Sequence, residues 1–235
     1  MIKNFTKKSE LEHFRKLSNE WWSESGKFKI LHDIRPIRIK YVLNHLETKN
    51  LKGLEVLDLG CGGGLISEPF ARLGCNVTGL DFVYENIKVA KIHAKENNLN
   101  INYKTVDLEN IKLKKKYEVI IIYEVLEHLN NWRKLIKSLK KNLSPDGLIF
   151  ISTINRNILS KIFAIDVAEN LLKWIPKNTH EYEKFIKPEE LEEVLKFEKF
   201  KIIDFTGLVF NPIMKNWKLS HKKTKINYFC CAELT

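Results

Sequence analysis

A run of glycines after an apolar stretch is the feature of this sequence best suited to bind a ligand. The apolar residues 56–59 lead into Gly60-Cys61-Gly62-Gly63-Gly64, in which four of five residues are glycine. Glycine has no Cβ, so its backbone can turn sharply and approach a ligand closely. Asp58 precedes the turn by two residues, and a second apolar stretch, 76–80, ends at Asp81. A doubly wound fold places at that point the acid that binds ribose hydroxyls.

The spacing of the glycines separates this turn from two other nucleotide-binding loops. A dinucleotide fingerprint that starts at Gly60 requires glycine at position 65, which is Leu65, and a P-loop requires Gly-Lys-Ser/Thr at its end. What remains is an acid two residues before a G-x-G-x-G turn, with a second acid after the next strand. This combination resembles the nucleoside-binding half of class I S-adenosylmethionine-dependent methyltransferases. The alternative is a turn that is tight for structural reasons alone.

A second group of chemically capable residues is Tyr123-Glu124-Val125-Leu126-Glu127-His128. If these residues begin a helix, the i, i+3, i+4 spacing puts Glu124, Glu127 and His128 on one side. Two carboxylates and an imidazole can bind a divalent cation, or can act as a general base toward a phenol, whose pKa is near 10. Similar stretches occur in methyltransferases that use no metal, so both interpretations stay open. The Asp/Asn-Pro-Pro-aromatic motif of adenine amino methylation is not present here.

The elements that must position these residues alternate between strand and helix. Apolar runs and helical periodicity predict strands at 55–59, 76–80, 101–105, 117–122 and 147–153, and helices at 64–73, 84–97 and 131–142. This alternation predicts a parallel sheet with helices on both faces. Ligands of such sheets bind beyond the carboxyl ends of the strands, where Gly60, Asp81, Asp107 and Tyr123 fall.

Regions before and after this core complete the expected domain. Residues 9–48 are predicted to be helical, with Trp21 and Trp22 in core packing and a break at 31–36. Pro188 is typical of a helix start, and strands near 200–206 and 226–231 would form a hairpin. We expect one α/β domain with a seven-stranded, mostly parallel sheet and an antiparallel last strand. Its parts are a helical cap (1–50), a cofactor-binding core (51–153), an amphipathic insertion (155–187), and a C-terminal helix and hairpin (188–235).

The insertion is amphipathic. Apolar residues between 158 and 175 define two helical faces that are out of phase, and Lys161, Lys173 and Lys177 flank them. Such a segment suits a lipid interface, with Trp174 at the depth of the headgroups. A lid that packs on the domain is the other interpretation.

Composition limits the classes of partner and the compartment. The 235-residue chain has a formal net charge of +11, but only six of its 40 basic residues are Arg. Because guanidinium is the favoured group for reading phosphates and bases, we expect no nucleic-acid partner. The cysteines Cys61, Cys75, Cys230 and Cys231 show neither metal-ligand nor disulfide-framework spacing, which favours reduced thiols in the cytoplasm. No apolar run has the length of a membrane span or of a signal peptide.

Segments spread over nearly the whole chain resemble a narrower family, the O-methyltransferases of ubiquinone biosynthesis. The matching segments are Trp21-Trp22, 26–38, the glycine turn, 124–128, 152–157, 176–180, 184–188 and 207–212. Many methyltransferases share the glycine turn, whereas the Trp-Trp, Leu-His-x-Ile and Thr-His segments are far more specific. The resemblance implies S-adenosylmethionine-dependent methylation of a 2-polyprenyl-6-hydroxyphenol and a 3-demethylubiquinol.

The resemblance also implies which residues contact the cofactor. They are Arg38, Asp58, Gly60, Gly62, Asp81, Asp107 and Tyr123. Arg38 would bind the methionine carboxylate, a pairing that suits a guanidinium fork. Asp107 would approach the adenine amino group. Tyr123 replaces a methionine of a related bacterial sequence, so its backbone or ring face is the expected contact.

Metal and acid-base roles are implied in the same way. In eukaryotic relatives two glutamates and a histidine are taken to bind magnesium, which implies Glu124, Glu127 and His128 as ligands here. Glu124 and His128 are also the candidates for catalysis. His32 and His180 are candidates for a second base near the substrate, although a structural role is the commoner fate of a lone histidine.

The substrate implied by the resemblance bears on the insertion. A polyprenyl tail is insoluble in water, so an enzyme that uses it must meet it at a bilayer. This favours peripheral binding at the inner face of the membrane, with other ubiquinone-biosynthesis proteins as possible partners. A methyltransferase for a soluble acceptor and a non-catalytic scaffold of a quinone-biosynthesis assembly are the alternatives.

Overall fold

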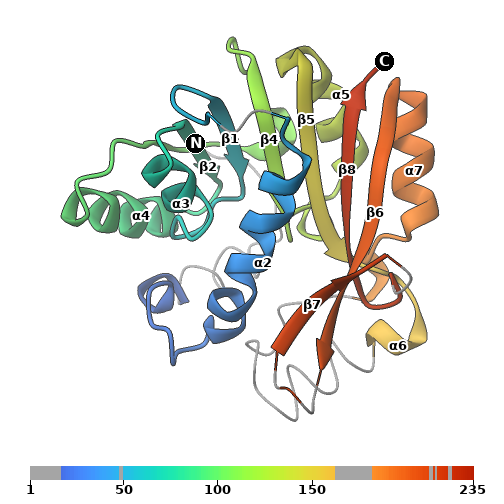
Figure 1. The fold of residues 1–235 in the computed structure, drawn as a ribbon, viewed down its shortest axis with the longest axis horizontal. Coiled ribbons are helices and arrows are strands. Elements are labelled where there is room, and N and C mark those ends of the chain that lie inside the picture. The colour runs from blue at the N-terminus through green and yellow to red at the C-terminus, as the bar shows by residue number, and fades with distance from the viewer. Residues whose placement is uncertain (1–16, 48–49, 162–181, 212–213, 215, 222–223) are drawn as a thin grey trace.

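The computed structural model describes residues 17–47, 50–161, 182–211, 214, 216–221 and 224–235. Within them, eight strands form one sheet in the order β3-β2-β1-β4-β5-β8-β6-β7 (Figure 1). The strands are β1 (Glu55–Leu59), β2 (Asn76–Asp81), β3 (Asn102–Thr105), β4 (Tyr117–Tyr123), β5 (Leu143–Ile154), β6 (Phe200–Asn211), β7 (Asn216–Ser220) and β8 (Asn227–Leu234).

The first five strands are parallel and confirm the predicted α/β core. β1 pairs with β2 and β4, β2 also pairs with β3, and β4 also pairs with β5. Val56 and Leu57 point to opposite faces of the sheet, yet both are fully buried. A parallel sheet covered on both faces has this pattern, and its carboxyl ends meet at one edge.

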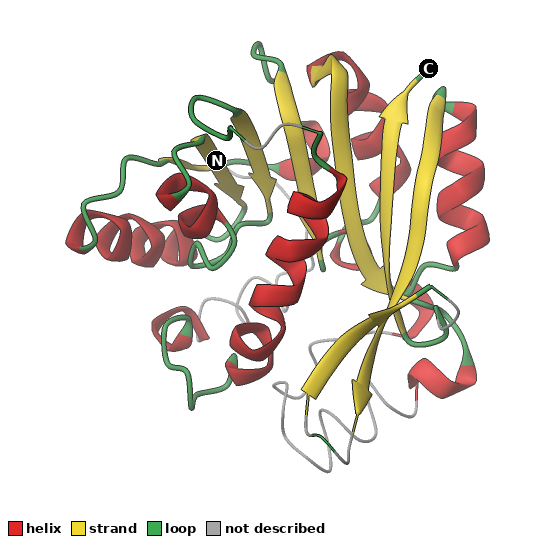
Figure 2. Cartoon of the chain, in the orientation of Figure 1, coloured by secondary structure: helices red, strands yellow, loops and turns green. Residues whose placement is uncertain are grey.

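The last three strands are antiparallel. β8 lies between β5 and β6, so the predicted hairpin of the 200–206 and 226–231 strands is confirmed. The sequence did not predict β7, which pairs with Gly207–Asn211 of β6. Because β6 continues to Asn211, its far end offers a free edge to β7, and the sheet has eight strands rather than seven. Figure 2 shows this β6–β7 hairpin reaching past the other strands.

Helices cover both faces of the sheet. α2 (Lys29–His45) and α3 (Ser67–Arg72) contribute to the core on one face, and α5 (Trp132–Leu139) and α7 (Pro188–Phe197) to the core on the other. α4 (Tyr84–Glu96) packs on Tyr103 of β3. In Figure 1, α2 crosses one face of the sheet and α7 runs along β6. The predicted layers are therefore present.

The helical cap differs from the prediction. α2 runs unbroken through Pro36, whereas the sequence predicts a break at 31–36. Proline lacks the N–H that would bond to the carbonyl of residue 32, but His32 and Ile34 are buried on the same helix, and this packing keeps the helix continuous. Trp21 and Trp22 lie in turns, not in a helix. Residues 9–16 of the predicted helix lie outside the described residues.

Two predicted helices are shorter than expected. α3 begins only at Ser67, because the preceding residues still belong to the glycine turn. α5 ends at Leu139 and a 3-10 helix continues to Asn142. In the insertion, α6 (Ile158–Ser160) is described, and the rest of the two predicted amphipathic helices lies outside the described residues. None of the helices that the structure describes has the length and apolarity needed to cross a bilayer.

Tyr41 joins α2 to the antiparallel half of the sheet. Its side chain is 1% exposed, and its hydroxyl donates a hydrogen bond to Asp204 Oδ2 of β6 at 2.8 Å. We expect Tyr41→Phe to lower the free energy of unfolding by about 2 kcal/mol, because a hydrogen bond to a charged acceptor is lost. Urea denaturation measures the change, and Tyr84→Phe, at a side chain 63% exposed, is the control. Equal stability of the two variants would contradict this role.

Candidate active site

The glycine turn joins the carboxyl ends of β1 and β2. Gly60 has a φ of +71°, and a Cβ there would lie 2.2 Å from Val125 Cγ2, so only glycine fits. The Gly60 and Cys61 N–H groups donate to the Leu80 carbonyl at 2.7 and 3.0 Å. The backbone of the turn is thereby fixed to the end of β2.

Asp81 is the acceptor at the centre of this turn. The N–H groups of Gly62 (2.9 Å) and Val83 (2.7 Å) and the Asn86 side chain (3.4 Å) donate to its carboxylate. Burial nevertheless raises the pKa of Asp81 to about 6. The sequence correctly placed this acid at the end of β2, next to the turn.

Asp58 is the second buried acid of the turn. Its carboxylate accepts a hydrogen bond from Ser67 Oγ at 2.6 Å. Burial raises the pKa of Asp58 to about 7, because this bond and the more distant Arg38 charge do not compensate for lost hydration. Asp58 and Asp81 thus both titrate close to neutral pH.

Trp21 covers the glycine turn. A Cβ at Gly62 would lie 2.3 Å from Trp21 Cη2, and one at Gly63 would lie 2.5 Å from Trp21 Cβ. The sequence predicted that glycine keeps this space open for a ligand, and the structure fills part of it with an indole. Trp21 is therefore a wall of the candidate site as well as a packing residue.

Arg38 is buried beside the end of β4. Its side chain, from α2, donates through Nη2 to Glu124 Oε1 at 2.8 Å, and its buried Nε has no hydrogen-bond partner in the described part of the chain. The Tyr123 ring lies 5.4 Å from the guanidinium carbon, and the Tyr123 hydroxyl donates to the Arg38 carbonyl at 3.3 Å. Arg38 is thus held in place by Glu124 and Tyr123.

Glu124 does not begin a helix. Its φ is +54°, in the left-handed region, and only a 3-10 helix, Leu126–His128, follows. The prediction that Glu124, Glu127 and His128 share one side of an α-helix is therefore wrong. The backbone reverses at Glu124 because its carboxylate is bound on three sides, a strained geometry that tertiary contacts maintain.

Three donors from separate elements surround Glu124 Oε1. Besides Arg38, Ser152 Oγ of β5 donates at 2.7 Å and Asn227 Nδ2 of β8 at 3.0 Å. Burial alone would raise the pKa of Glu124, but Arg38 and these hydrogen bonds hold it below its ordinary value. Ser152 lies in a segment that carried the family resemblance, whereas no sequence signal pointed to Asn227.

The pKa of Glu127 is shifted in the opposite direction to that of Glu124. It is 2% exposed and accepts a hydrogen bond from Thr153 Oγ1 at 2.9 Å. Burial and the neighbouring Glu124 charge raise the pKa of Glu127 well above its ordinary value. The pKa values of the two carboxyl groups are therefore shifted in opposite directions, as expected for like charges that share a buried site.

A divalent cation does not fit this arrangement as it stands. In the part of the chain that the structure describes, no three His, Cys, Asp or Glu side chains are grouped as metal ligands. Glu124 Oε1 is already surrounded by the three donors Arg38, Ser152 and Asn227. The predicted ligand set of Glu124, Glu127 and His128 is thus not assembled.

The remaining predicted site residues have local partners. Asp107 caps a 3-10 helix by accepting from Glu109 N at 3.0 Å and from Asn110 Nδ2 at 2.8 Å. His32 Nε2 lies 2.8 Å from the Trp21 carbonyl, so this histidine holds the cap. His180 lies outside the described residues. Arg38, the glycine turn, Asp58, Asp81 and Tyr123 lie together at the carboxyl edge of the sheet.

Comparisons with known sequences identify the kind of protein that this chain is similar to. A family model described as a methyltransferase domain matches residues 31–204. A Pelagibacter ubique protein called ubiquinone biosynthesis O-methyltransferase is 43% identical, over 96% of this chain and 97% of its own length. A protein of the same name from Rickettsia prowazekii is 43% identical, over 96% of this chain and 90% of its own length.

Comparisons with solved structures support the fold. Magnesium protoporphyrin IX methyltransferase from Synechocystis, solved with bound SAH, has a TM-score of 0.69 at 18% identity and covers 95% of this chain and 97% of its own. An S-adenosylmethionine-dependent methyltransferase from Clostridium acetobutylicum has a TM-score of 0.67 at 15% identity and covers 94% and 99%. At these identities the likeness shows the class I methyltransferase fold.

The raised pKa of Asp58 predicts a pH-dependent cost to stability. Below about pH 4 the Asp58 carboxyl is protonated in both the folded and the unfolded chain, so it has no effect. As the pH rises toward 7, the unfolded chain loses this proton first, and folding is progressively disfavoured until the cost levels off above pH 7. We expect Asp58→Asn to raise the free energy of unfolding at pH 8 by up to about 4 kcal/mol.

Urea denaturation at pH 4, 6 and 8 measures this effect. The gain should shrink toward pH 4, where wild type and variant carry the same charge at this position. Asp146→Asn, at an exposed residue, is the matched control. A gain that is the same at pH 4 and pH 8 would contradict a buried, uncharged Asp58.

Proposed function

Because the chain belongs to the family of ubiquinone biosynthesis O-methyltransferases, we propose that it methylates polyprenylated phenols and catechols with S-adenosylmethionine. The acceptors are a 2-polyprenyl-6-hydroxyphenol and a 3-demethylubiquinol. The single observation that carries the proposal is the 43% identity to a ubiquinone biosynthesis O-methyltransferase over 96% of this chain and 97% of the relative.

The arrangement at the carboxyl edge of the sheet suits S-adenosylmethionine. The Arg38 guanidinium can donate to the methionine carboxylate, since its Nε has no hydrogen-bond partner among the residues that the structure describes. Asp81 can accept from the ribose hydroxyls, as the acid of this position does in doubly wound folds. We assign Gly60, Gly62, Asp58 and Tyr123 to the same site because they lie on the turn and the strand ends between Arg38 and Asp81. Asp107 is the weakest of the assigned contacts, since its carboxylate already caps a 3-10 helix.

Glu124 orients Arg38 for this role. The ion pair is 2.8 Å long, and the Arg38 side chain is 6% exposed. A carboxylate whose pKa is lowered is a weak base, so we assign to Glu124 the positioning of Arg38 and not the removal of a proton. In water-poor surroundings such a preorganised pair fixes the charge that faces the cofactor.

His128 is the candidate for proton removal. S-adenosylmethionine supplies a methyl group bound to positively charged sulfur. Transfer forms a carbon–oxygen bond to the acceptor, breaks the sulfur–carbon bond and leaves S-adenosylhomocysteine, and the phenolic proton must pass to a base. An imidazole is suited to this step near neutral pH.

The function assay is methyl transfer to a short-chain demethylubiquinol. We expect the wild type to turn over, and Arg38→Ala to lower kcat/KM for S-adenosylmethionine about 100-fold, because a charge-assisted contact to a buried carboxylate is lost. Arg133→Ala, at an exposed residue, is the control. Binding of S-adenosylhomocysteine without any turnover would favour a scaffold, and turnover only of soluble phenols would favour a different acceptor class.

The same assay decides on magnesium at Glu124, Glu127 and His128. The hydrogen bonds already made to Glu124 lead us to expect that a chelator leaves turnover within about twofold of the untreated enzyme. If turnover is lost with chelator and restored by magnesium, these three residues do bind the metal. Glu124 must then give up some of its present hydrogen bonds to become a ligand.

We also propose that the protein works in the cytoplasm at the inner face of a membrane, where a polyprenyl tail resides. Ile158 and Leu159 of α6, at the start of the insertion, are 73% and 46% exposed. Apolar side chains at that exposure, next to Lys161, suit insertion between lipid headgroups. Contact with other ubiquinone-biosynthesis proteins at the same surface would bring the acceptor from one enzyme to the next.

Liposome co-sedimentation tests the membrane proposal. We expect the wild type to sediment with anionic vesicles, and the Ile158→Glu/Leu159→Glu double variant to bind at least about fivefold more weakly, because carboxylates are expelled from the interface and repelled by anionic lipid. Phe197→Glu, at a side chain 79% exposed on α7, is the control. Equal binding by both variants would show that α6 does not contribute to membrane binding.

A further inference from the structure

The cap residues 17–28 contact the cofactor turn through Trp21. The Trp21 indole N–H donates to Asn86 Oδ1 at 2.8 Å, and the Asn86 side chain also donates to Asp81 at 3.4 Å. On the cap side, Trp21 stacks on Phe28 with ring centroids 4.2 Å apart. The position of Trp21 is therefore coupled to that of Asp81 through a single side chain.

Trp22 fixes the same segment from a second direction. Its indole N–H donates to the Gly63 carbonyl at 2.9 Å. Its ring stacks on His93 of α4, with centroids 3.5 Å apart and an angle of 7° between the planes. Trp21 thus packs over the Cα atoms of Gly62 and Gly63, whereas Trp22 binds the Gly63 carbonyl.

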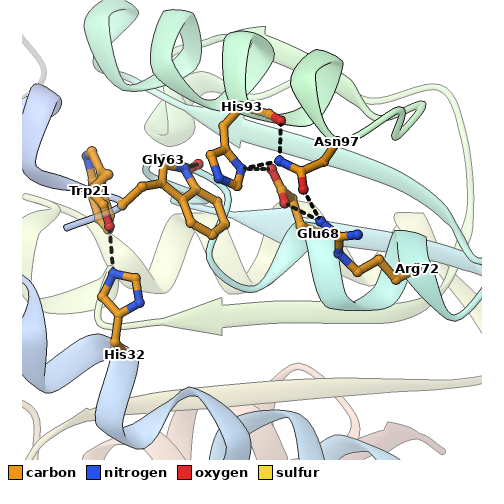
Figure 3. A network of polar contacts seen from close by, with 8 residues as sticks. Trp21, His32, Gly63, Glu68, Arg72, His93 and Asn97 are labelled. Carbon is orange, nitrogen blue, oxygen red and sulfur yellow. Dashed lines mark hydrogen bonds and ion pairs between the residues drawn. The ribbon is translucent and has the colours of Figure 1, made fainter. Parts of the chain in front are cut away.

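The His93 ring is held in turn by Glu68, as Figure 3 shows. Its Nδ1 lies 2.6 Å from Glu68 Oε1 of α3, and because a carboxylate only accepts, Nδ1 is the donor. The Glu68 side chain is 2% exposed, and Arg72 and Asn97 complete its surroundings: Arg72 lies 3.5 Å from Glu68 and donates to Asn97 at 2.7 Å. A buried carboxylate with these partners fixes the plane of the imidazole.

We propose that His93 is a positioning residue for the cofactor. Together with Glu68 and Trp22 it forms a latch, the Trp22–His93–Glu68 stack, that holds residues 17–28 on the glycine turn. This inference rests on the proposed function, because it assigns to the latch the placement of Trp21 beside the cofactor. His93 acts through Trp22, whose indole N–H reaches the turn at Gly63.

Two features separate a latch from ordinary packing. The stack joins the cap, α3 and α4 at one point, in addition to the Trp21–Asn86 hydrogen bond between the cap and α4 and the Arg72–Asn97 hydrogen bond between α3 and the end of α4. It also ends on the backbone carbonyl of Gly63, whose neighbour Gly62 donates to Asp81. Release of Trp22 therefore leaves Trp21 held on the turn only by Asn86 and Phe28, while the sheet and its core stay intact.

Three variants of the latch test the proposal. His93→Gln keeps a donor for Glu68 but removes the ring, His93→Phe keeps a ring under Trp22 but no donor, and Trp22→Phe keeps a ring but loses the bond to Gly63. Lys91→Ala, at an exposed position of α4, is the control. The readouts are calorimetric affinity for S-adenosylhomocysteine, KM and kcat in the methyl-transfer assay, and the rate of tryptic cleavage at the exposed Lys27 without cofactor.

We expect His93→Gln and Trp22→Phe to weaken S-adenosylhomocysteine binding about tenfold, since each loses a stacking or hydrogen-bonding contact. KM for S-adenosylmethionine should rise by a similar factor with kcat within about twofold, and Lys27 should be cleaved faster. His93→Phe should lie closer to the wild type than His93→Gln, because the ring carries the contact to Trp22.

Unchanged affinity and unchanged cleavage in His93→Gln would overturn the latch. If that variant does not fold, Trp22→Phe decides by the same readouts. A wild type that binds no S-adenosylhomocysteine would overturn the proposed function instead, and the cleavage rates would still show whether the stack holds the cap.

Discussion

The buried ion pair between Arg38 and Glu124 is the interaction on which the rest of the site depends. A charge removed from water is tolerated only when it is paired and hydrogen-bonded, and here four elements meet that requirement together. Arg38 comes from α2, Glu124 from the end of β4, Ser152 from β5 and Asn227 from β8. The site is therefore complete only when α2 has packed on the sheet and the antiparallel strands have paired with the parallel ones.

This pairing also explains how the local acids divide their roles. Glu124 faces Arg38 and two further donors, which lower its pKa, while burial and the neighbouring carboxylate raise the pKa of Glu127. Burial also raises the pKa of Asp58 to about 7 and that of Asp81 to about 6. Glu124 is therefore the acid of this group whose charge the surrounding side chains stabilise, which offsets the cost of burying it.

The glycine turn meets two requirements at once. Backbone N–H groups of the turn bind Asp81 and the Leu80 carbonyl, which fixes the ends of two parallel strands. The missing Cβ atoms also admit protein side chains, Val125 at Gly60 and Trp21 at Gly62. The turn is therefore a junction between the sheet and the cap, and the Trp22–His93–Glu68 stack extends that junction to α3 and α4.

The sequence by itself determined the α/β core, the order of its first five strands along the chain, the turn with its acids, and the family. These follow from apolar periodicity and from short spacings, which depend only on neighbours in the chain. Tertiary structure decided the rest: the extra strand β7, the continuous α2 through Pro36, the left-handed Glu124, and the partners Asn227 and His93. Each of these depends on a contact between residues far apart in sequence, where burial and pairing outweigh local preference, and no local pattern encodes which distant side chain will provide it.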